Sequence, residues 1–140
     1  MTEAMSGIYR ELSMSLREDL REALRKGDTS LLGVVLNVLL AWPDTCFRDE
    51  LVRHPRSKQQ LAFVLALMNG TEASPKELEL LRICKAEKAR GRRILVYSTY
   101  TGTRDTTARL KNFLEKEGFK TAVLRASVEA TRCSSPVKAT

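Results

Sequence analysis

The sequence predicts an α/β protein in which a helical N-terminal region precedes one βαβ unit with two parallel strands. Two observations lead to this fold class. Leucines recur at helical spacing near the start of the chain, and after Gly91 the pattern changes to short, continuous apolar runs. The 140 residues and the hydrophobic fraction of 43% suit one small domain, or one domain with an appendage.

The first predicted element is an amphipathic helix over residues 7–26. Gly27 is suited to the left-handed position at its C-terminal end, and Asp28 or Thr29 can cap the helix that follows. The opposite face of the helix is charged and is expected to be solvated. The apolar stripe repeats every four residues and consists of Ile8, Leu12, Leu16, Leu20 and Leu24.

The next segments are strongly apolar. Residues 31–42 carry apolar side chains on nearly every side, which predicts a helix that is buried all round and ends at Pro43. Residues 46–57 are expected to add one or two helical turns. The apolar run at residues 61–68 is too short for its periodicity to distinguish a helix from a strand.

A capping box then marks the start of another helix. Ser74 supplies the cap, Pro75 occupies the first helical position, and Glu77 lies three residues after the cap. This helix is expected to run to about Arg90 and to stop at Gly91. Its inward apolar positions are predicted to be Leu78, Leu81, Ile83 and Ala86.

The βαβ unit is predicted from the change of period after that helix. Residues 94–98 and 121–124 are short apolar runs of the kind found in buried parallel strands. Between them lie a polar loop and a helix that Gly118 ends, and we expect a right-handed crossover. The apolar positions of this helix are Ala108, Leu110, Phe113 and Leu114. Two strands are not a stable parallel sheet, so the helical region or a partner must cover them.

The balance of charge favours a polyanionic partner. The chain has 24 Lys and Arg against 17 Asp and Glu, for a formal net charge of +7. Such an excess most often indicates nucleic acid, although it also serves solubility. A basic run precedes the first predicted strand and contains Arg82, Lys85, Lys88, Arg90, Arg92 and Arg93.

The cysteines and the histidine predict neither a metal site nor a catalytic set. Cys46, Cys84 and Cys133 are far apart, and His54 has no cysteine or carboxylate nearby at a suitable spacing. Scattered cysteines behind an acidic N-terminus without a secretory leader predict reduced thiols in a cytoplasmic protein. No apolar run has the length of a membrane-spanning helix, so no membrane partner is expected.

The polar loop after the first predicted strand is the candidate binding site. It lies at the end of a strand and the start of a helix, where backbone N–H groups and the helix dipole favour a phosphate. Its residues are Ser98, Thr99, Tyr100, Thr101, Gly102, Thr103 and Arg104. Hydroxyl groups, a ring that stacks and a cation suit contacts to a nucleic-acid backbone. The alternative is a loop whose threonines only cap the helix.

The motifs of an autonomous ATPase are absent. The chain has no GxxxxGK[ST] phosphate loop and no acidic metal-binding motif after an apolar strand. It also lacks a Ser/His/Asp or Cys/His set. We therefore predict no catalytic residue, no metal ligand and no cofactor for this chain alone.

Residues 74–127 resemble the start of the second RecA-like domain of superfamily-two helicases, of the Swi/Snf type or related DEAD/DEAH-like members. The resemblance rests on a lysine-containing helix, a charged turn, the strand and loop ILVYSTYTGT, a helix and a second strand leading to Arg125-Ala126-Ser127. It implies a partial RecA-like, P-loop NTPase-type parallel sheet. It also implies that Ser98 to Arg104 form helicase motif IV, whose loop contacts the nucleic-acid backbone.

The resemblance also implies a domain organisation. Residues 1–73 would be the helical connector between two RecA-like domains, residues 74–128 a partial helicase C-terminal domain, and residues 129–140 a disordered tail. The parent family uses ATP and Mg²⁺. Because the first domain and the later motifs of the second are missing, ATP hydrolysis by this chain alone is not expected.

Three hypotheses for function remain open. The leading one is a truncated helicase C-terminal-domain protein, inactive alone, that binds nucleic acid weakly, with DNA the expected partner and the missing helicase domain a further one. The alternative is a small helical interaction protein that binds another protein and inhibits a helicase or a nucleic-acid-guided complex. The third is a small enzyme whose site is the loop at residues 99–104.

Overall fold

The structure is a computed structural model, and it describes residues 1–100 and 102–125. Within these residues the protein is mixed α/β, with four α-helices and one two-stranded antiparallel sheet. The chain divides into two compact units, and the boundary falls within a helix, between Glu79 and Leu80. In chain order the elements are α1 (Glu3–Arg25), α2 (Ser30–Thr45), β1 (Glu50–Arg53), β2 (Gln60–Val64), α3 (Pro75–Ala89), the short 3-10 helix η1 (Gly102–Arg104) and α4 (Thr107–Lys116).

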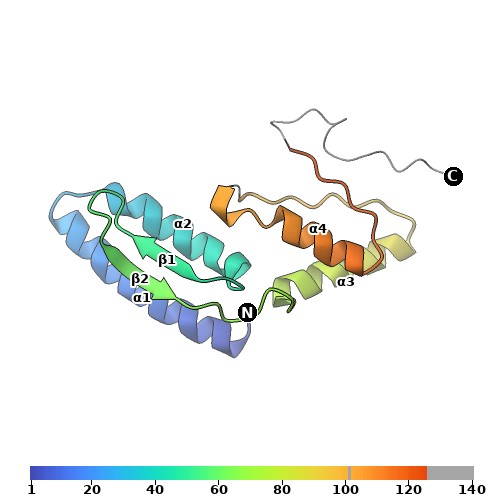
Figure 1. Cartoon of the computed structure of the whole chain (residues 1–140), viewed down its shortest axis with the longest axis horizontal. Coiled ribbons are helices and arrows are strands. Elements are labelled where there is room, and N and C mark those ends of the chain that lie inside the picture. The colour runs from blue at the N-terminus through green and yellow to red at the C-terminus, as the bar shows by residue number, and fades with distance from the viewer. Residues whose placement is uncertain (101, 126–140) are drawn as a thin grey trace. The chain divides into compact units, whose positions relative to one another are not determined.

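The first unit, residues 1–79, consists of α1 and α2 packed side by side, with the β1–β2 hairpin covering them (Figure 1). The apolar stripe predicted for the first helix supplies much of its core, although Leu24 is exposed. Burial of this stripe removes apolar surface from water and holds the two layers together. The buried core residues are Met5, Leu12, Leu16, Leu31, Val35, Val38, Trp42, Cys46 and Val52.

The hairpin replaces the one or two helical turns expected at residues 46–57, so that prediction is wrong, and β2 shows that the undecided run at residues 61–68 begins as a strand. β1 and β2 are antiparallel, with Leu51 opposite Phe63 and Val52 opposite Ala62. Val52 points into the core, whereas Leu51 and Phe63 are exposed on the other face. This alternation has the period of two that a strand requires. It spans only four or five residues in each strand, which is too short to stand out against a helical pattern.

Helix α2 is also less buried than expected. Val35 and Val38 face the core, but Leu32, Leu36 and Leu40 are 41, 51 and 65% exposed. These three leucines lie four residues apart and form one stripe on the outer side of the helix. The helix continues through Pro43 to Thr45, because a proline near the end of a helix interrupts little of the hydrogen bonding beyond it.

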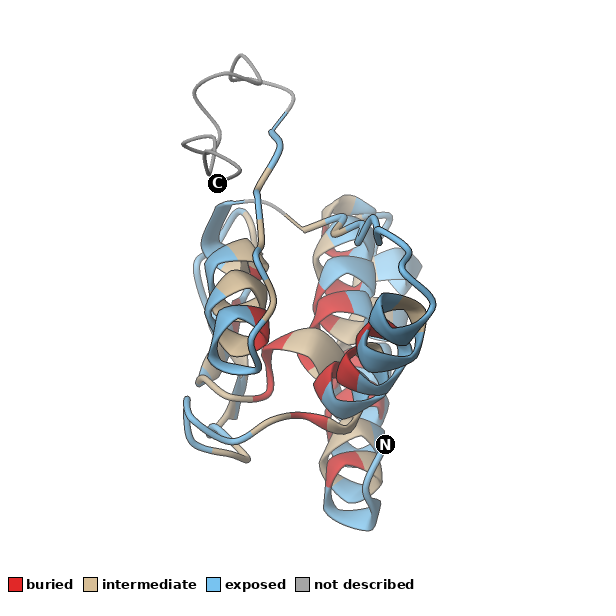
Figure 2. Cartoon of the chain, turned by 90° about the vertical axis from the view of Figure 1, so that its right-hand side faces the viewer, coloured by how far each residue is buried: buried red, intermediate tan, exposed pale blue. Residues whose placement is uncertain are grey.

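The second unit, described over residues 80–125, contains most of α3 together with α4. Leu81 and Cys84 of α3 and Leu114 of α4 form its buried core, with Leu80, Phe113 and Phe119 packed against them. The predicted inward positions Leu78 and Ile83 are instead 54 and 42% exposed. Figure 2 shows buried residues as stripes along the helices, with exposed residues on their other sides.

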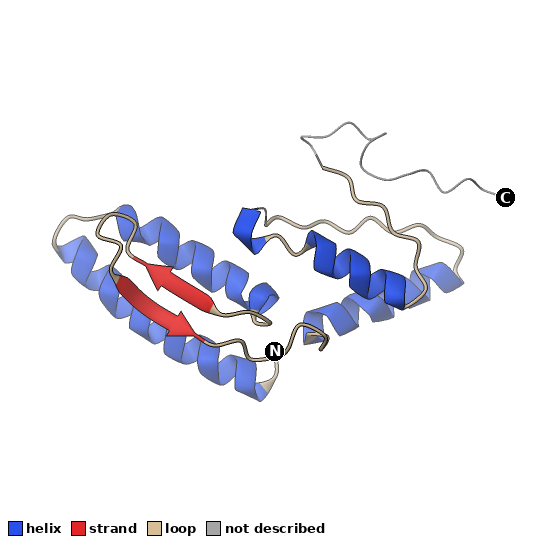
Figure 3. Ribbon diagram, viewed as in Figure 1, coloured by secondary structure: helices blue, strands red, loops and turns tan. Residues whose placement is uncertain are grey.

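The predicted parallel sheet is not formed within the described residues. Residues 94–98 and 121–124 have no regular secondary structure and are drawn as loops in Figure 3. Leu95 and Tyr97 are 80 and 88% exposed. Two short strands cannot hold a parallel sheet without further strands on their edges and helices on both faces, and residues 80–125, as far as the structure describes them, contain no such further strand.

The helix boundaries of the second unit agree with the sequence. Gly91 and Gly118 follow α3 and α4 with φ of 73° and 82°, a left-handed conformation that glycine adopts at low cost. At the start of α3, Ser74 and Glu77 form the predicted capping box.

None of the described helices combines the length and the apolar character that crossing a membrane requires.

Candidate functional site

The predicted binding loop, residues 98–104, forms the end of the irregular segment at residues 92–100 and the turn that precedes α4. Thr99 and Thr103 are exposed, whereas Ser98, Tyr100 and Arg104 are half-buried. Gly102 has φ of 67° and begins η1, a turn that the Asp105 N–H closes by bonding to the Gly102 carbonyl at 3.1 Å. Thr101 lies outside the described residues. The loop therefore leads directly into the start of α4, as the sequence predicts.

An aspartate occupies the N-terminal end of that helix. Asp105 Oδ1 accepts a hydrogen bond from the Thr107 N–H at 2.8 Å. Its Oδ2 accepts one from Arg125 at 2.7 Å, from beyond the helix. The bond from Thr107, followed by that from Arg125, lowers the pKa of Asp105 to about 2. A carboxylate thus takes the position at the helix start where a phosphate was expected, so any phosphate must be held by the loop and by nearby cations.

The charge of the protein is concentrated in this second unit. Residues 80–125 contain twelve Lys and Arg and four Asp and Glu, a net charge of +8, whereas residues 1–79 carry a net charge of −2. The whole positive excess of the chain therefore lies beyond residue 79. A positive field of this size over 46 residues attracts polyanions, most strongly at low ionic strength.

Some of these cations are held by the protein itself. Lys85 pairs with Glu117 at 3.0 Å, and Arg90 and Arg92 share Glu87 at 2.8 and 3.1 Å. The Lys88 ammonium donates to the Gly118 carbonyl at 3.0 Å and lies over the Phe119 ring, 4.7 Å from its centre. The contacts of Lys85 and Lys88 tie the second half of α3 to the turn after α4. Because the pairs are exposed, each adds little stability.

Three other cations are available to a ligand. The side chains of Arg93, Lys116 and Lys120 are exposed and make no hydrogen bond or ion pair with any residue that the structure describes. Arg93 lies near the start of the irregular segment at residues 92–100, Lys116 is the last residue of α4, and Lys120 follows that helix. An unpaired cation can neutralise a phosphate without first breaking a contact within the protein.

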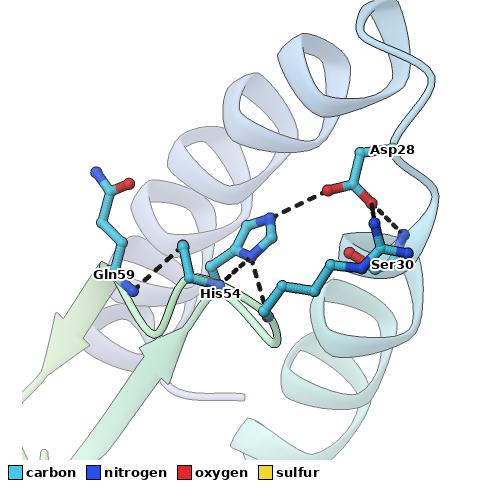
Figure 4. A network of polar contacts seen from close by, with 6 residues as sticks. Asp28, Ser30, His54 and Gln59 are labelled. Atoms are coloured by element: carbon cyan, nitrogen blue, oxygen red, sulfur yellow. Dashed lines mark hydrogen bonds and ion pairs between the residues drawn. The ribbon is translucent and has the colours of Figure 1, made fainter.

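The first unit contains a polar network that sequence reasoning missed. His54, expected to lack a carboxylate partner, has its Nε2 3.4 Å from Asp28 Oδ2 (Figure 4). Asp28 Oδ1 accepts the Ser30 N–H at 2.9 Å and so caps the start of α2. The bond from Ser30, with Arg56 and His54 nearby, holds the pKa of Asp28 below its ordinary value. The capping role of Asp28 could be predicted from its position; its approach to His54 could not, because the two are distant in sequence.

His54 also organises the turn between β1 and β2. Its Nδ1 accepts the N–H groups of Arg56 and Ser57 at 3.2 and 3.3 Å. The His54 carbonyl accepts the Lys58 N–H at 3.0 Å, and the His54 N–H bonds to the Gln59 carbonyl at 2.8 Å. Since Nδ1 is an acceptor, the proton of a neutral ring lies on Nε2, the ring nitrogen that faces Asp28. The pair is a structural clamp rather than a base with a free lone pair.

The two cysteines that the structure describes are likewise unsuited to nucleophilic chemistry. Cys46 and Cys84 are buried and unbridged. Burial raises the pKa of the Cys84 thiol, so the reactive thiolate is disfavoured. Among the described residues, no three His, Cys, Asp or Glu side chains gather as metal ligands would.

Comparison of the chain with protein-family models, with curated proteins and with solved structures finds no match in any of the three.

Proposed function

We propose that this protein binds the phosphodiester backbone of nucleic acid, with DNA the expected partner, through its basic second unit. The observation that carries the proposal is the net charge of +8 over residues 80–125, against −2 over residues 1–79. Contacts of this kind are independent of base sequence and weaken as salt rises.

The resemblance of residues 74–127 to a helicase C-terminal domain supports the same proposal. In that family the loop matched by Ser98 to Arg104 contacts the nucleic-acid backbone. On this basis the chain is derived from a helical connector and the first part of a RecA-like domain. The finer proposal is that residues 94–98 and 121–124 become parallel strands when neighbouring strands and covering helices are supplied.

A salt titration tests the proposal. Binding of the full chain to a fluorescein-labelled 20-bp DNA duplex is followed by anisotropy at several salt concentrations. We expect R93Q/K120Q to reduce the slope of log K against log[salt] by about two, since each lost phosphate contact removes about 0.9. Tyr100→Ala with Arg104→Ala is expected to weaken binding as well. Arg17→Ala with Arg21→Ala removes the same charge from α1 as R93Q/K120Q and should have a smaller effect.

Equal losses in all three variants would contradict binding at the second unit and indicate diffuse charge. In the same preparation, phosphate release from ATP with or without DNA is expected to stay at background, because ATP hydrolysis in the parent family requires both RecA-like domains. ATP turnover by the purified chain would contradict its assignment as a partial helicase.

The exposed leucines of α2 favour a second candidate function, that of a protein-interaction module. Leu32, Leu36 and Leu40 form an uncharged stripe on the outside of the first unit. Binding through it would bury apolar surface and change little with salt. If the protein binds a partner through this stripe, Leu36→Lys should abolish that binding and R93Q/K120Q should leave it unchanged. Binding that R93Q/K120Q weakens and Leu36→Lys does not would instead support the nucleic-acid function.

A further inference from the structure

The first unit is acidic overall, yet one end of it is basic. Residues 1–79 carry a net charge of −2, but residues 22–28 and 53–58 within them carry +3. These two segments are the end of α1 with the start of the next connection, and the turn between β1 and β2. Figure 1 shows the α1–α2 and β1–β2 connections at the same end of the unit. We call this surface the hairpin end; its cations are Arg25, Lys26, Arg53, Arg56 and Lys58.

The clamp between Asp28 and His54 builds this surface. The 3.4 Å contact joins the turn of the hairpin to the connection between the helices. It thereby brings the basic turn at residues 53–58, with a net charge of +3, next to Arg25 and Lys26 in a segment whose own net charge is zero. Arg56 lies 3.9 Å from the same Asp28 carboxylate, and His54 Nδ1 fixes the backbone of the turn. The cations are therefore presented on an ordered backbone, which reduces the entropy lost on binding.

The side chains at the hairpin end are accessible. The Arg56 side chain is 75% exposed and that of Lys26 is 71% exposed, and Arg53 and Lys58 are exposed as well. The acids are outnumbered: Glu22 pairs with Lys26, and Asp28 is engaged by Ser30 and His54.

The neighbouring residues indicate which polyanion fits. Ser57, Gln59 and Gln60 are exposed beside the cations, and hydroxyl and amide groups are common donors to phosphate and sugar oxygens. No aromatic or large aliphatic side chain occurs in residues 53–60 apart from His54. A surface that inserts into an anionic membrane combines cations with exposed apolar residues. This turn has the cations but lacks the large apolar side chains.

We propose that the hairpin end is a second binding site for the phosphodiester backbone of nucleic acid. It is built by the Asp28–His54 clamp and reads charge rather than base sequence. The site is independent of the one proposed for the second unit, and either can exist without the other.

The test compares two matched double variants of the full chain on the same labelled DNA duplex. R56Q/K58G removes two cations from the hairpin end. Lys58 has φ of 61°, so glycine suits its backbone conformation and the turn is expected to stay folded. R10Q/R17Q removes two exposed cations from α1, more than one helical turn away from this end. Circular dichroism confirms that each variant is folded.

We expect R56Q/K58G to weaken binding roughly ten-fold at about 0.1 M salt and to reduce the salt slope by about two, because two phosphate contacts are lost. R10Q/R17Q should leave the affinity and the salt slope nearly unchanged. Ser57→Lys, which adds a cation at the turn, should strengthen binding and steepen the slope. Equal effects of the two double variants, or no gain from Ser57→Lys, would overturn the proposal.

Two further comparisons separate the hairpin end from the second unit and from a membrane contact. If R56Q/K58G loses DNA binding and R93Q/K120Q does not, the result supports the site at the hairpin end and contradicts the function proposed for the second unit. If R93Q/K120Q loses DNA binding and R56Q/K58G does not, the result overturns the hairpin-end proposal and leaves the function of the second unit standing. Phosphatidylserine vesicles serve as a second probe. If R56Q/K58G lost vesicle binding while DNA binding was unchanged, the surface would be a membrane contact and the proposal would be wrong.

Discussion

Asp28 and Asp105 stand in equivalent places, each two residues before the backbone N–H that it accepts. Asp28 bonds to the Ser30 N–H at 2.9 Å and Asp105 to the Thr107 N–H at 2.8 Å. Both carboxyl groups have a lowered pKa because these bonds favour the charged form. Each satisfies a donor at the start of a helix, and both stabilise the fold more strongly when they are ionised.

The pKa of Asp105 leads to a prediction about acid stability. Its folded value of about 2 lies below the ordinary 3.8. The stabilisation from its charge is therefore fully present above about pH 4 and is lost as the pH falls through 2. The amide signal of Thr107 should titrate with a midpoint near pH 2 in a series of ¹H–¹⁵N NMR spectra.

Two variants separate the charge of Asp105 from its hydrogen bond. Asp105→Asn keeps an acceptor oxygen and should retain the start of α4 but lose the titration. Asp105→Ala should lose both and fray the first turn of the helix. A midpoint near pH 4 in the wild-type protein would show that neither Thr107 nor Arg125 favours the ionised carboxylate.

At the scale of the element, the helix ends are decided by local sequence and the hairpin is not. The capping box at Ser74 and the glycines at 91 and 118 act on backbone groups within four residues, so their effect can be read directly from the sequence. β1 and β2 exist because each pairs with the other and because Val52 is buried against helices from another part of the chain. Such long-range pairing leaves only a weak local signal.

The capping box gives a prediction for α3. The Glu77 N–H donates to Ser74 Oγ at 3.2 Å, and the Ser74 N–H donates to Glu77 Oε2 at 2.8 Å. Both residues are buried, so water cannot readily replace these bonds. Ser74→Ala should destabilise the first turn by about 1 kcal/mol, and amide exchange there should quicken by roughly five-fold.

Matched substitutions test the mechanism at α3. Ser74→Asp retains an acceptor and Glu77→Gln retains the reciprocal bond, so each should exchange nearly as slowly as the wild type. Amide exchange measured by NMR over residues 75–79 distinguishes these two variants from Ser74→Ala. Unchanged exchange in Ser74→Ala would contradict a stabilising role for the cap.

The whole molecule has two units with separate cores and opposite charge. The core of the first contains nine buried residues from two helices and a strand, whereas that of the second contains three within the described residues. Small cores bury too little apolar surface to offset the entropy of ordering the chain. The second unit should therefore open more readily than the first.

A core substitution tests this division. Leu16 is fully buried in the first unit, and Leu16→Ala should destabilise that unit by about 2–5 kcal/mol through lost burial and a cavity. Hydrogen exchange followed by mass spectrometry should show faster exchange in α1, α2 and the hairpin, with α4 unchanged and already fast. A comparable loss of protection from hydrogen exchange in α4 would contradict the independence of the two units.

The sequence by itself predicted where the four α-helices lie, the capping box at Ser74, the glycines that follow α3 and α4, and the excess of positive charge. These features depend on residues within a turn or two of one another, or on composition alone. The sequence also predicted helical turns at residues 46–57 that are absent. The tertiary structure decided that residues 50–64 form a hairpin and that α2 presents an exposed leucine stripe. It also decided that Asp28 meets His54. Strand pairing, burial and ion pairs between distant residues require the chain to be folded before their free energy is gained, and no local pattern specifies them.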